Sequence, residues 1–433
     1  MDYEKLKDRA SKVFDDYELF FLKEKVKKYE TRDAELCGVE IKYEEGIALR
    51  GIKDKRLVFS YTYDREDMAI EMLIENGVSL LPYVEKDENA GFPGKYENYP
   101  STSVYDSEGL KADDINKVAM LVEMEKAIID FDKRIVVTRN CELQEADIQV
   151  KIMNSNGLTA EARKTLYMLS AMAVAKDGDE VSWYDWLWSD RLNEIDAKAF
   201  GIHTAQKTVS FLSSEQIETG VYDGMLTPQA SSDMLGILSS SFLSENLYKD
   251  KTMLKGKKGA KCFSRIVNIK DSGTEGTDSF PFDGEGVPSC ENIVVKEGFF
   301  DTFLYDSYYG RKYDVPSTAN CERAGVKELP KCGTRGFFIE KGLRNIAGEL
   351  TNGIIIEELM GTHTANPVTG DFSLGAIGYL CKNGIKRPFK GVIFSGNIFE
   401  LLNNVKEIGN DLRFFGTYGS PSLYVEGLKI SGK

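Results

Sequence analysis

Histidine is nearly missing from this chain: only His203 and His363 occur among 433 residues. Histidine is the commonest zinc ligand in proteins and the usual proton carrier near neutral pH. The motifs HExxH and HxH are absent, and so is any Cys/His cluster, so neighbouring residues cannot assemble a zinc site of the usual kind. A Ser-His-Asp or Cys-His catalytic site would have to be built around one of these two histidines.

A disulfide framework and membrane segments are missing too. The seven cysteines are scattered and never form a CxxC pair, which favours free thiols in a reducing cytosol. The first 18 residues are charged throughout and lack the apolar core of a signal peptide. The most apolar stretch, residues 166–175, has ten residues, whereas a membrane helix needs about 20. We therefore expect a cytoplasmic protein that does not enter a membrane.

Positive charge is in deficit. The chain has 55 Lys and Arg against 69 Asp and Glu, a formal net charge of −14. This balance argues against nucleic acid as the bulk partner, because phosphate binding needs a cationic surface, but it leaves room for a local basic patch. The one dense cationic run, residues 255–261, lacks the spacing of a Walker loop, so we expect a surface loop or one that touches an acidic peptide.

What is present suits a globular protein of two domains, which we place at residues 1–215 and 216–433. The first half mixes helices, at residues 1–16 and 113–130, with runs rich in β-branched and aromatic residues. The second half has short strands separated by glycine turns. The fold class is therefore α+β, with an N-terminal α+β domain followed by a mainly antiparallel, β-rich C-terminal domain.

Local signals place several elements within these halves. Separate strands are predicted at residues 36–43 and 46–51, and again at 134–141 and 147–154. Residues 53–55 and 154–157 read as turns that connect strands. Thr227 as a helix cap and Pro228 at the first helical position predict a helix that continues to Tyr248.

The end of the first half holds His203 and all three tryptophans, which are Trp183, Trp186 and Trp188. His203 lies within a helical stretch, where we expect it to be structural. A tryptophan cluster can serve as a binding platform, but packing between elements is the commoner role of such residues.

Two glycine-rich segments carry candidate chemistry. The turn FPFDGEGVP, residues 280–288, places Asp283 and Glu285 beside Gly286, where another backbone can approach closely. This pair could act as acid and base. With no histidine or metal ligand nearby, a structural or ligand-lining turn is the better interpretation.

The second segment is the polar loop in EELMGTHTANPVTGDFSLG, which starts at Glu357. It lies between an apolar run and a predicted strand, a position typical of binding residues. His363 could therefore line a cleft, although a lone histidine on a surface loop is often incidental. The candidate residues here are Thr362, His363, Thr364, Asn366 and Asp371.

The second half also carries ordered motifs that resemble a known family. They are GMLTPQASSDMLGIL from Gly224, PFDGEGVP from Pro281, LYDSYYGR from Leu304, STANC from Ser317, NPVTGDFS from Asn366 and SGNIFELLNNVKEIGN from Ser395. Their order is similar to that of the TldD/TldE family, and within it the TldE branch, also called PmbA and described as a modulator of DNA gyrase.

This resemblance implies one subunit of a cytosolic two-subunit zinc metalloprotease that digests unfolded peptides and matures peptide antibiotics. In the family, the TldD subunit carries an HExxxH helix and a cysteine near its C-terminus. Here residues 227–248 contain no histidine, and residues 415–424 contain no cysteine. The resemblance therefore implies no catalytic residue and no metal in this chain, with zinc bound by a TldD-like partner.

The same resemblance implies that this chain grips an unfolded peptide. Its partner would be a TldD-like subunit or a second copy of itself. The turn at Asp283, Glu285 and Gly286 and the His363 loop would line the peptide cleft.

Two alternatives remain open. One is a stand-alone homodimeric metallopeptidase with an atypical site built from His363, Asp371 and a carboxylate from elsewhere. The other is a regulatory binding protein of the gyrase-modulator type, without proteolysis.

Overall fold

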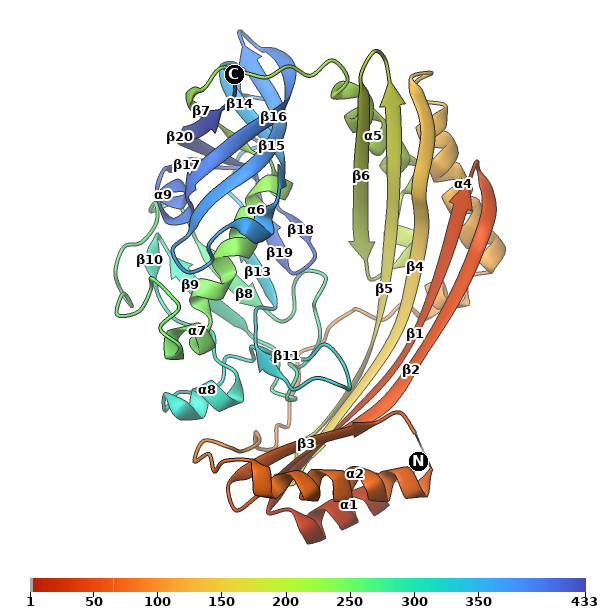
Figure 1. Ribbon diagram of the computed structural model, residues 1–433, viewed down its shortest axis with the longest axis vertical. Coiled ribbons are helices and arrows are strands. Elements are labelled where there is room, and N and C mark those ends of the chain that lie inside the picture. Colours follow the sequence, from red (N-terminus) through yellow and green to blue (C-terminus); the bar gives the residue numbers. More distant parts are fainter. Residues whose placement is uncertain (1–2, 65) are drawn as a thin grey trace.

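The computed structural model describes residues 3–64 and 66–433 and places them in two bodies that stand side by side (Figure 1). A tall curved sheet from the first half of the chain faces a more globular body from the second half. The chain passes from one body to the other between α5 (Ala197–Ser210) and β7 (Gly220–Leu226). The α+β fold class expected from the sequence is confirmed.

The first body is built on a six-stranded, fully antiparallel sheet in the order β3-β2-β1-β4-β5-β6. Strands of up to 20 residues span about 65 Å at about 3.3 Å per residue. The bounds are β1 (Asp16–Arg32), β2 (Glu35–Lys53), β3 (Arg56–Thr62), β4 (Ile135–Asn154), β5 (Thr159–Lys176) and β6 (Glu180–Ser189).

Both predicted turns of this sheet are present. Asp54 and Lys55 have positive φ between β2 and β3, and Gly157 has φ +83° between β4 and β5. The predicted breaks within β2 and β4 are wrong, because each pair of short strands is one continuous strand. In β4 the register shifts between Arg139 and Glu142, so a bulge interrupts the apolar pattern without ending the strand.

Helices cover the sheet at two places. Helices α4 (Asp114–Ile129) and α5 pack against each other and against one face of the sheet, around a core that includes Tyr29 and Tyr167. Helices α1 (Tyr3–Val13) and α2 (Asp67–Leu80) lie below β3 at the foot of the sheet (Figure 1). The connecting elements are η1 (Leu81–Tyr83), α3 (Ser107–Lys111) and η2 (Leu192–Glu194).

The second body contains two further six-stranded sheets and a small hairpin. One sheet has the order β16-β15-β14-β7-β20-β17 and closes on itself because β16 also pairs with β20. Its bounds are β7 (Gly220–Leu226), β14 (Gly353–Met360), β15 (Asp371–Lys382), β16 (Ile385–Asn397), β17 (Val405–Ile408) and β20 (Leu423–Ser431).

The other sheet has the order β10-β9-β8-β13-β19-β18, and the hairpin pairs β11 with β12. The strands are β8 (Ile269–Ser272), β9 (Glu291–Lys296), β10 (Phe299–Phe300), β11 (Cys321–Glu322), β12 (Lys331–Cys332), β13 (Gly336–Ile339), β18 (Arg413–Phe415) and β19 (Tyr418–Ser420). Most pairings are antiparallel; among the described residues, β7–β14 and β13–β19 are the parallel pairs.

Helix α6 (Pro228–Ser239) packs against both sheets of this body, and its apolar side enters their shared core. Thr227 caps it as predicted, since the threonine hydroxyl accepts from the Ala230 backbone N–H. The helix does not continue to Tyr248. It ends in the 3-10 turn η3 (Ser240–Phe242), and extended backbone at Leu243 precedes α7 (Ser244–Tyr248).

The remaining helices are short. They are η4 (Thr362–Thr364), α8 (Ser307–Lys312) and α9 (Ile398–Asn403). Throughout the described part of the chain, every helix is too short or too polar to cross a lipid bilayer.

Candidate functional site

A cleft of about 350 Å³ lies beside α6, and we refer to it as the α6 cleft. It is bounded by the C-terminal end of α6, the β11–β12 hairpin, the loop around η4 and the ring of Tyr418 in β19. Its lining consists of Gly236, Ile237, Ser239, Ser240, Leu243, Glu322, Gly333, Thr334, Thr362, His363, Ala365, Pro367 and Tyr418.

Two contacts from α6 fix the wall formed by Tyr418. A Cβ on Gly236 would lie 3.1 Å from the tyrosine ring, so glycine lets this ring lie directly on the helix. The Ser239 hydroxyl donates to the Tyr418 hydroxyl at 3.2 Å. Small residues on α6 therefore leave the space that the cleft occupies.

The polar loop from the sequence analysis forms the opposite wall. Thr362 and His363 line the cleft, and His363 is exposed. Gly361 takes the left-handed conformation before η4, and its carbonyl accepts from the Thr364 hydroxyl at 2.8 Å. The Ser241 hydroxyl donates to the carbonyl of Pro367 and so connects the loop to the end of α6.

Asn366 and Asp371 hold this loop in shape by hydrogen bonds within it and to Asn397. The Asn366 side chain accepts from the backbone N–H groups of Val368 and Thr369, at 2.9 and 3.2 Å. Asp371 accepts from the Thr369 hydroxyl at 2.7 Å and from the Asn397 amide at 2.8 Å. These hydrogen bonds hold the pKa of the Asp371 carboxyl below its usual value.

The other candidate segment lies elsewhere. Asp283 and Glu285 are 3% and 2% exposed and are absent from the lining of the α6 cleft. Asp283 shapes its own turn by accepting from the backbone N–H groups of Glu285 and Val287, at 2.9 and 3.0 Å. Gly286 has φ +83°, and its carbonyl accepts from the Tyr99 hydroxyl of the first body. This turn joins the two bodies.

A buried ion network, which we name the junction network, explains why this turn is carboxylate-rich. Arg50 on β2 donates to both oxygens of Glu18 on β1, at 2.9 and 2.5 Å, and to Glu285 at 2.9 Å. Arg323 donates to Glu18 at 2.8 Å. Two cations and two anions, all nearly inaccessible to water, thus connect the first sheet to the second body.

Sequence reasoning missed this network, since its members are up to 305 residues apart. The available signal was a charged residue within each of two apolar strand segments, Glu18 in β1 and Arg50 in β2. Burial by itself would raise the pKa of Glu18, but Arg50 and Arg323 hold that pKa below its usual value.

Two neighbouring carboxyls, Asp283 and Asp306, form no ion pair with any described arginine or lysine, although Arg335 and Arg311 act on them from a distance. Burial raises the pKa of Asp283 to about 7, and the charge of Glu285 contributes to this rise. Burial likewise raises the pKa of Asp306, the cap of α8, to about 7, again with a contribution from Glu285. Both groups therefore carry a proton in the folded protein at a pH where they would be ionised in the unfolded chain.

The Asp306→Asn variant tests this protonation. Asparagine can keep the cap, in which Asp306 accepts from the Tyr309 N–H at 2.7 Å. Because the pKa of Asp306 is raised in the folded protein, the stability that this group contributes is complete below about pH 4. It falls as the pH rises from about 4 to about 7 and is lost above that pH. The variant should therefore gain stability relative to the original chain by up to about 1.4 kcal/mol per pH unit across this window.

Urea unfolding at pH 5, 6, 7 and 8 would measure the difference between the two proteins. The exposed Asp314→Asn is the matched control, for which parallel curves are expected. A difference between Asp306→Asn and the original chain that stays constant with pH would contradict the prediction.

The residues of the α6 cleft do not fit a zinc ion. The only side chains of ligand type in its lining are Glu322 and His363, fewer than the three protein ligands of a hydrolytic site. Asp233 on α6 is not part of the lining; burial and the nearby Glu358 raise its pKa to about 7. Within residues 3–64 and 66–433, no group of three or more His, Cys, Asp or Glu could hold a metal.

His203 lies apart from the cleft. Its Nδ1 atom is 2.9 Å from the carboxylate of Asp185, so it connects α5 to β6. This contact agrees with the structural role expected for His203.

Comparison with known proteins covers nearly the whole chain. Residues 17–81, 108–212 and 219–432 match the family models of PmbA/TldA metallopeptidase domain 1, central domain and C-terminal domain. An uncharacterized protein of Methanocaldococcus jannaschii is 28% identical over 99% of both chains. The metalloprotease PmbA of Escherichia coli O157:H7 is 24% identical over 93% of this chain and 89% of its own.

The fold also matches a solved structure. The crystal structure of TldE from Thermococcus kodakarensis superimposes with a TM-score of 0.90 at 24% identity, over 99% of each chain. Three consecutive family domains, in order and along most of the sequence, make the chain a member of the PmbA/TldD metallopeptidase family.

Proposed function

We propose that this chain is the non-catalytic, peptide-binding subunit of a TldD/TldE-type zinc metalloprotease. The observation that carries the proposal is the composition of the α6 cleft. Helix α6, which corresponds to the HExxxH helix of TldD proteins, borders an open cleft of about 350 Å³. The lining of this cleft offers one histidine and one glutamate, fewer than the three protein ligands that a hydrolytic zinc ion needs. Hydrolysis then depends on zinc held by a TldD-like partner.

The cleft suits an extended peptide better than a small polar metabolite. Ile237, Leu243 and Tyr418 give it apolar surface for side chains. Ser240 and Thr362 add hydroxyl groups that can bond to a peptide backbone. Main-chain hydrogen bonds do not depend on side-chain identity, so such a surface can hold many unfolded sequences.

Blocking the cleft tests the proposal. The chain is mixed with a TldD-like protein, and hydrolysis of an unfolded casein substrate is followed. Thr362→Trp should fill the cleft and lower the peptidase activity of the mixture at least tenfold, chiefly by raising KM, while the two proteins still co-elute. Thr351→Trp, on an exposed turn before β14, is the matched control and should leave the activity unchanged.

The chain by itself should contain no stoichiometric zinc and should not cleave casein. Zinc at one equivalent that is lost in His363→Ala would instead support a stand-alone metallopeptidase. Failure to co-elute with a TldD-like protein, together with no gain in peptidase activity, would favour a regulatory binding protein.

A further inference from the structure

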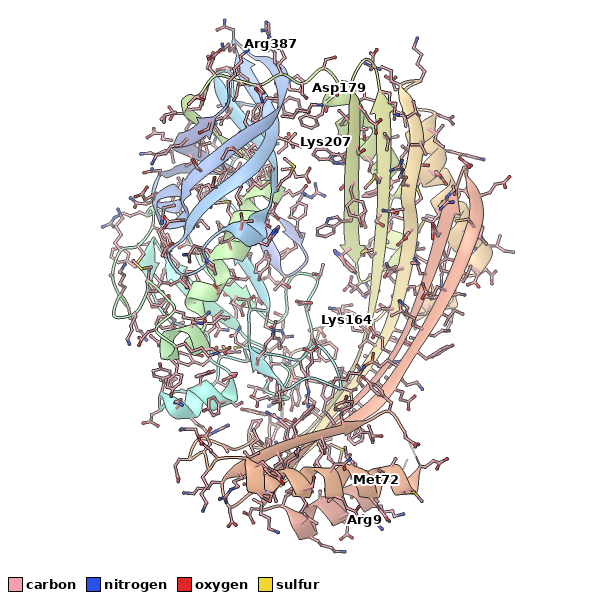
Figure 2. All side chains as sticks on the ribbon, viewed as in Figure 1. Arg9, Met72, Lys164, Asp179, Lys207 and Arg387 are labelled. Carbon is pink, nitrogen blue, oxygen red and sulfur yellow. The ribbon has the colours of Figure 1, made fainter. Side chains whose placement is uncertain are left out.

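A second pocket of about 350 Å³ lies between the two bodies, and we name it the inter-body pocket. One wall comes from β5, β6 and the segment after β6. The other wall comes from β18 and from the turn at Gly276 and Thr277. The labelled Lys164 lies in this region, between the tall sheet and the second body (Figure 2). The lining includes Lys164, Leu166, Trp186, Trp188, Phe414 and Phe415.

Lys164 is an unusual group for such a place. Its side chain is buried, at 8% exposure for the residue, and its ammonium donates to the backbone carbonyl of Thr277 across the pocket. An ammonium has three N–H donors. Among the described carboxylates, none forms an ion pair with it, and Asp190 and Asp278 act only from a distance. Burial lowers the pKa of Lys164 to about 8.

Aromatic rings line the same pocket as this ammonium. Trp186 meets Trp188 edge to face at 6.3 Å between centroids and meets Phe415 in the same way at 5.9 Å. Gly276 has φ +72°, and a Cβ there would lie 2.7 Å from the Phe414 ring, so a glycine turn allows this ring its position. The lining of the pocket therefore combines flat apolar surfaces with one buried positive charge.

Charges at the rim restrict the ligand further. Asp190 and the exposed Glu194 also line the pocket, next to the exposed Arg413. Two carboxylates would repel a phosphate or another polyanion. A ligand with a single carboxylate attached to an apolar ring carries less negative charge past these two groups than a polyanion does, and it can still pair with the buried cation.

We propose that the inter-body pocket binds a carboxylate that adjoins an aromatic side chain, with Lys164 holding the carboxylate and Trp186, Trp188 and Phe415 holding the ring. In a peptide, this group is either a C-terminal aromatic residue or an acidic residue next to an aromatic one. The peptide as the natural source of this group rests on the proposed function.

The inter-body pocket and the α6 cleft share the β18–β19 hairpin. Phe415 of the pocket pairs directly with Tyr418 of the cleft in the β18–β19 hairpin. The β18–β19 hairpin packs against α6 and contributes to both sites, so a peptide anchored at Lys164 can extend along this hairpin toward the α6 cleft. The pocket provides an anchor, and the cleft holds the chain that extends from it.

Intrinsic fluorescence can test the site on the full chain alone. Two of the three tryptophans, Trp186 and Trp188, line the pocket and report on binding there. The third, Trp183, is stacked on Phe211 and is not part of the lining. N-acetyl-Ala-Phe with a free carboxylate should quench the emission and bind at least tenfold more tightly than N-acetyl-Ala-Phe amide. Lys164→Met should abolish this preference, and the exposed Lys133→Met is the matched control that should keep it.

The two sources of the carboxylate are separated by N-acetyl-Phe-Glu amide. Binding as tight as that of the free acid means that Lys164 accepts either source; binding tenfold weaker means that the chain terminus is the ligand. Equal binding of acid and amide by the original chain would overturn the proposal, and so would a preference that survives in Lys164→Met. If Lys164→Met does not fold, as judged by circular dichroism, the comparison of acid and amide in the original chain decides.

The outcome is independent of the proposed function, because no partner protein or zinc is used. Binding of the dipeptide by a chain that does not stimulate a TldD-like protein would leave the pocket standing and refute the subunit role. Stimulation of the partner without dipeptide binding would do the reverse.

Discussion

Replacing Arg50 by methionine is expected to lower the free energy of unfolding by about 3–5 kcal/mol. Arg50 is 5% exposed and is the shared donor to Glu18 and Glu285 in the junction network. Methionine replaces the aliphatic part of arginine but removes the charged guanidinium, so Glu285 loses its cation and Glu18 keeps only Arg323. Urea unfolding followed by tryptophan fluorescence measures the loss, since all three tryptophans lie in the same sheet as Arg50.

An exposed arginine provides the control. Arg344 pairs with Glu349 and Glu407 at 65% side-chain exposure, and Arg344→Met should cost less than about 1 kcal/mol. Adding Glu285→Gln to Arg50→Met should recover part of the loss, because one buried carboxylate then no longer lacks a partner. A cost for Arg50→Met as small as that of Arg344→Met would mean that the junction network does not stabilise the protein.

The second large effect is expected in the core of the second body. Phe242→Ala should cost about 3–5 kcal/mol, because it leaves a cavity among rings that cannot collapse onto it. Phe242 is fully buried, and its ring centroid lies 5.5 to 6.4 Å from those of Phe337, Phe300 and Phe263. Far-UV circular dichroism is the suitable measurement, since every tryptophan is in the other body.

Two further variants check the cause of this loss. Phe242→Leu refills most of the space and should cost less than half as much as Phe242→Ala. Tyr83→Ala removes an aromatic ring that is 85% exposed and should change stability by no more than about 0.5 kcal/mol. If Phe242→Leu were as destabilising as Phe242→Ala, lost volume would not be the reason.

These two regions have different consequences for the candidate sites. Phe242 belongs to the turn that ends α6, so loosening its core also loosens the wall of the α6 cleft. The junction network instead holds the foot of the tall sheet against the second body. The inter-body pocket lies between the same two bodies, and its shape therefore depends on how firmly they are joined.

Several local features could be predicted from the sequence because their causes are local. A capping threonine followed by proline starts α6, whatever the helix later packs against. The turns at 53–55 and 154–157 lie where small or polar residues allow positive φ. The polar loop at His363 lies beside a cleft because polar runs between rigid elements come to the surface.

Other features could not be predicted, because their causes are distant in the chain. The strand β4 continues through polar residues since β1 and β5 pair with it on both sides, and β2 does so through its pairing with β1. Asp283 and Glu285 resemble an open acidic turn in sequence, but Arg50, contributed from 235 residues away, makes Glu285 part of a buried ion pair. No single-sequence pattern reports that a distant strand will supply this cation.

The sequence by itself determined the α+β class, the start of α6 and the scarcity of metal ligands around it, because these depend on residue type and on near neighbours. Only the tertiary structure decided which charges are buried, which candidate residues share a cleft, and that Lys164 lines the same pocket as the aromatic rings of β18. Burial and ion pairing depend on distances between segments far apart in the chain, and folding alone sets those distances.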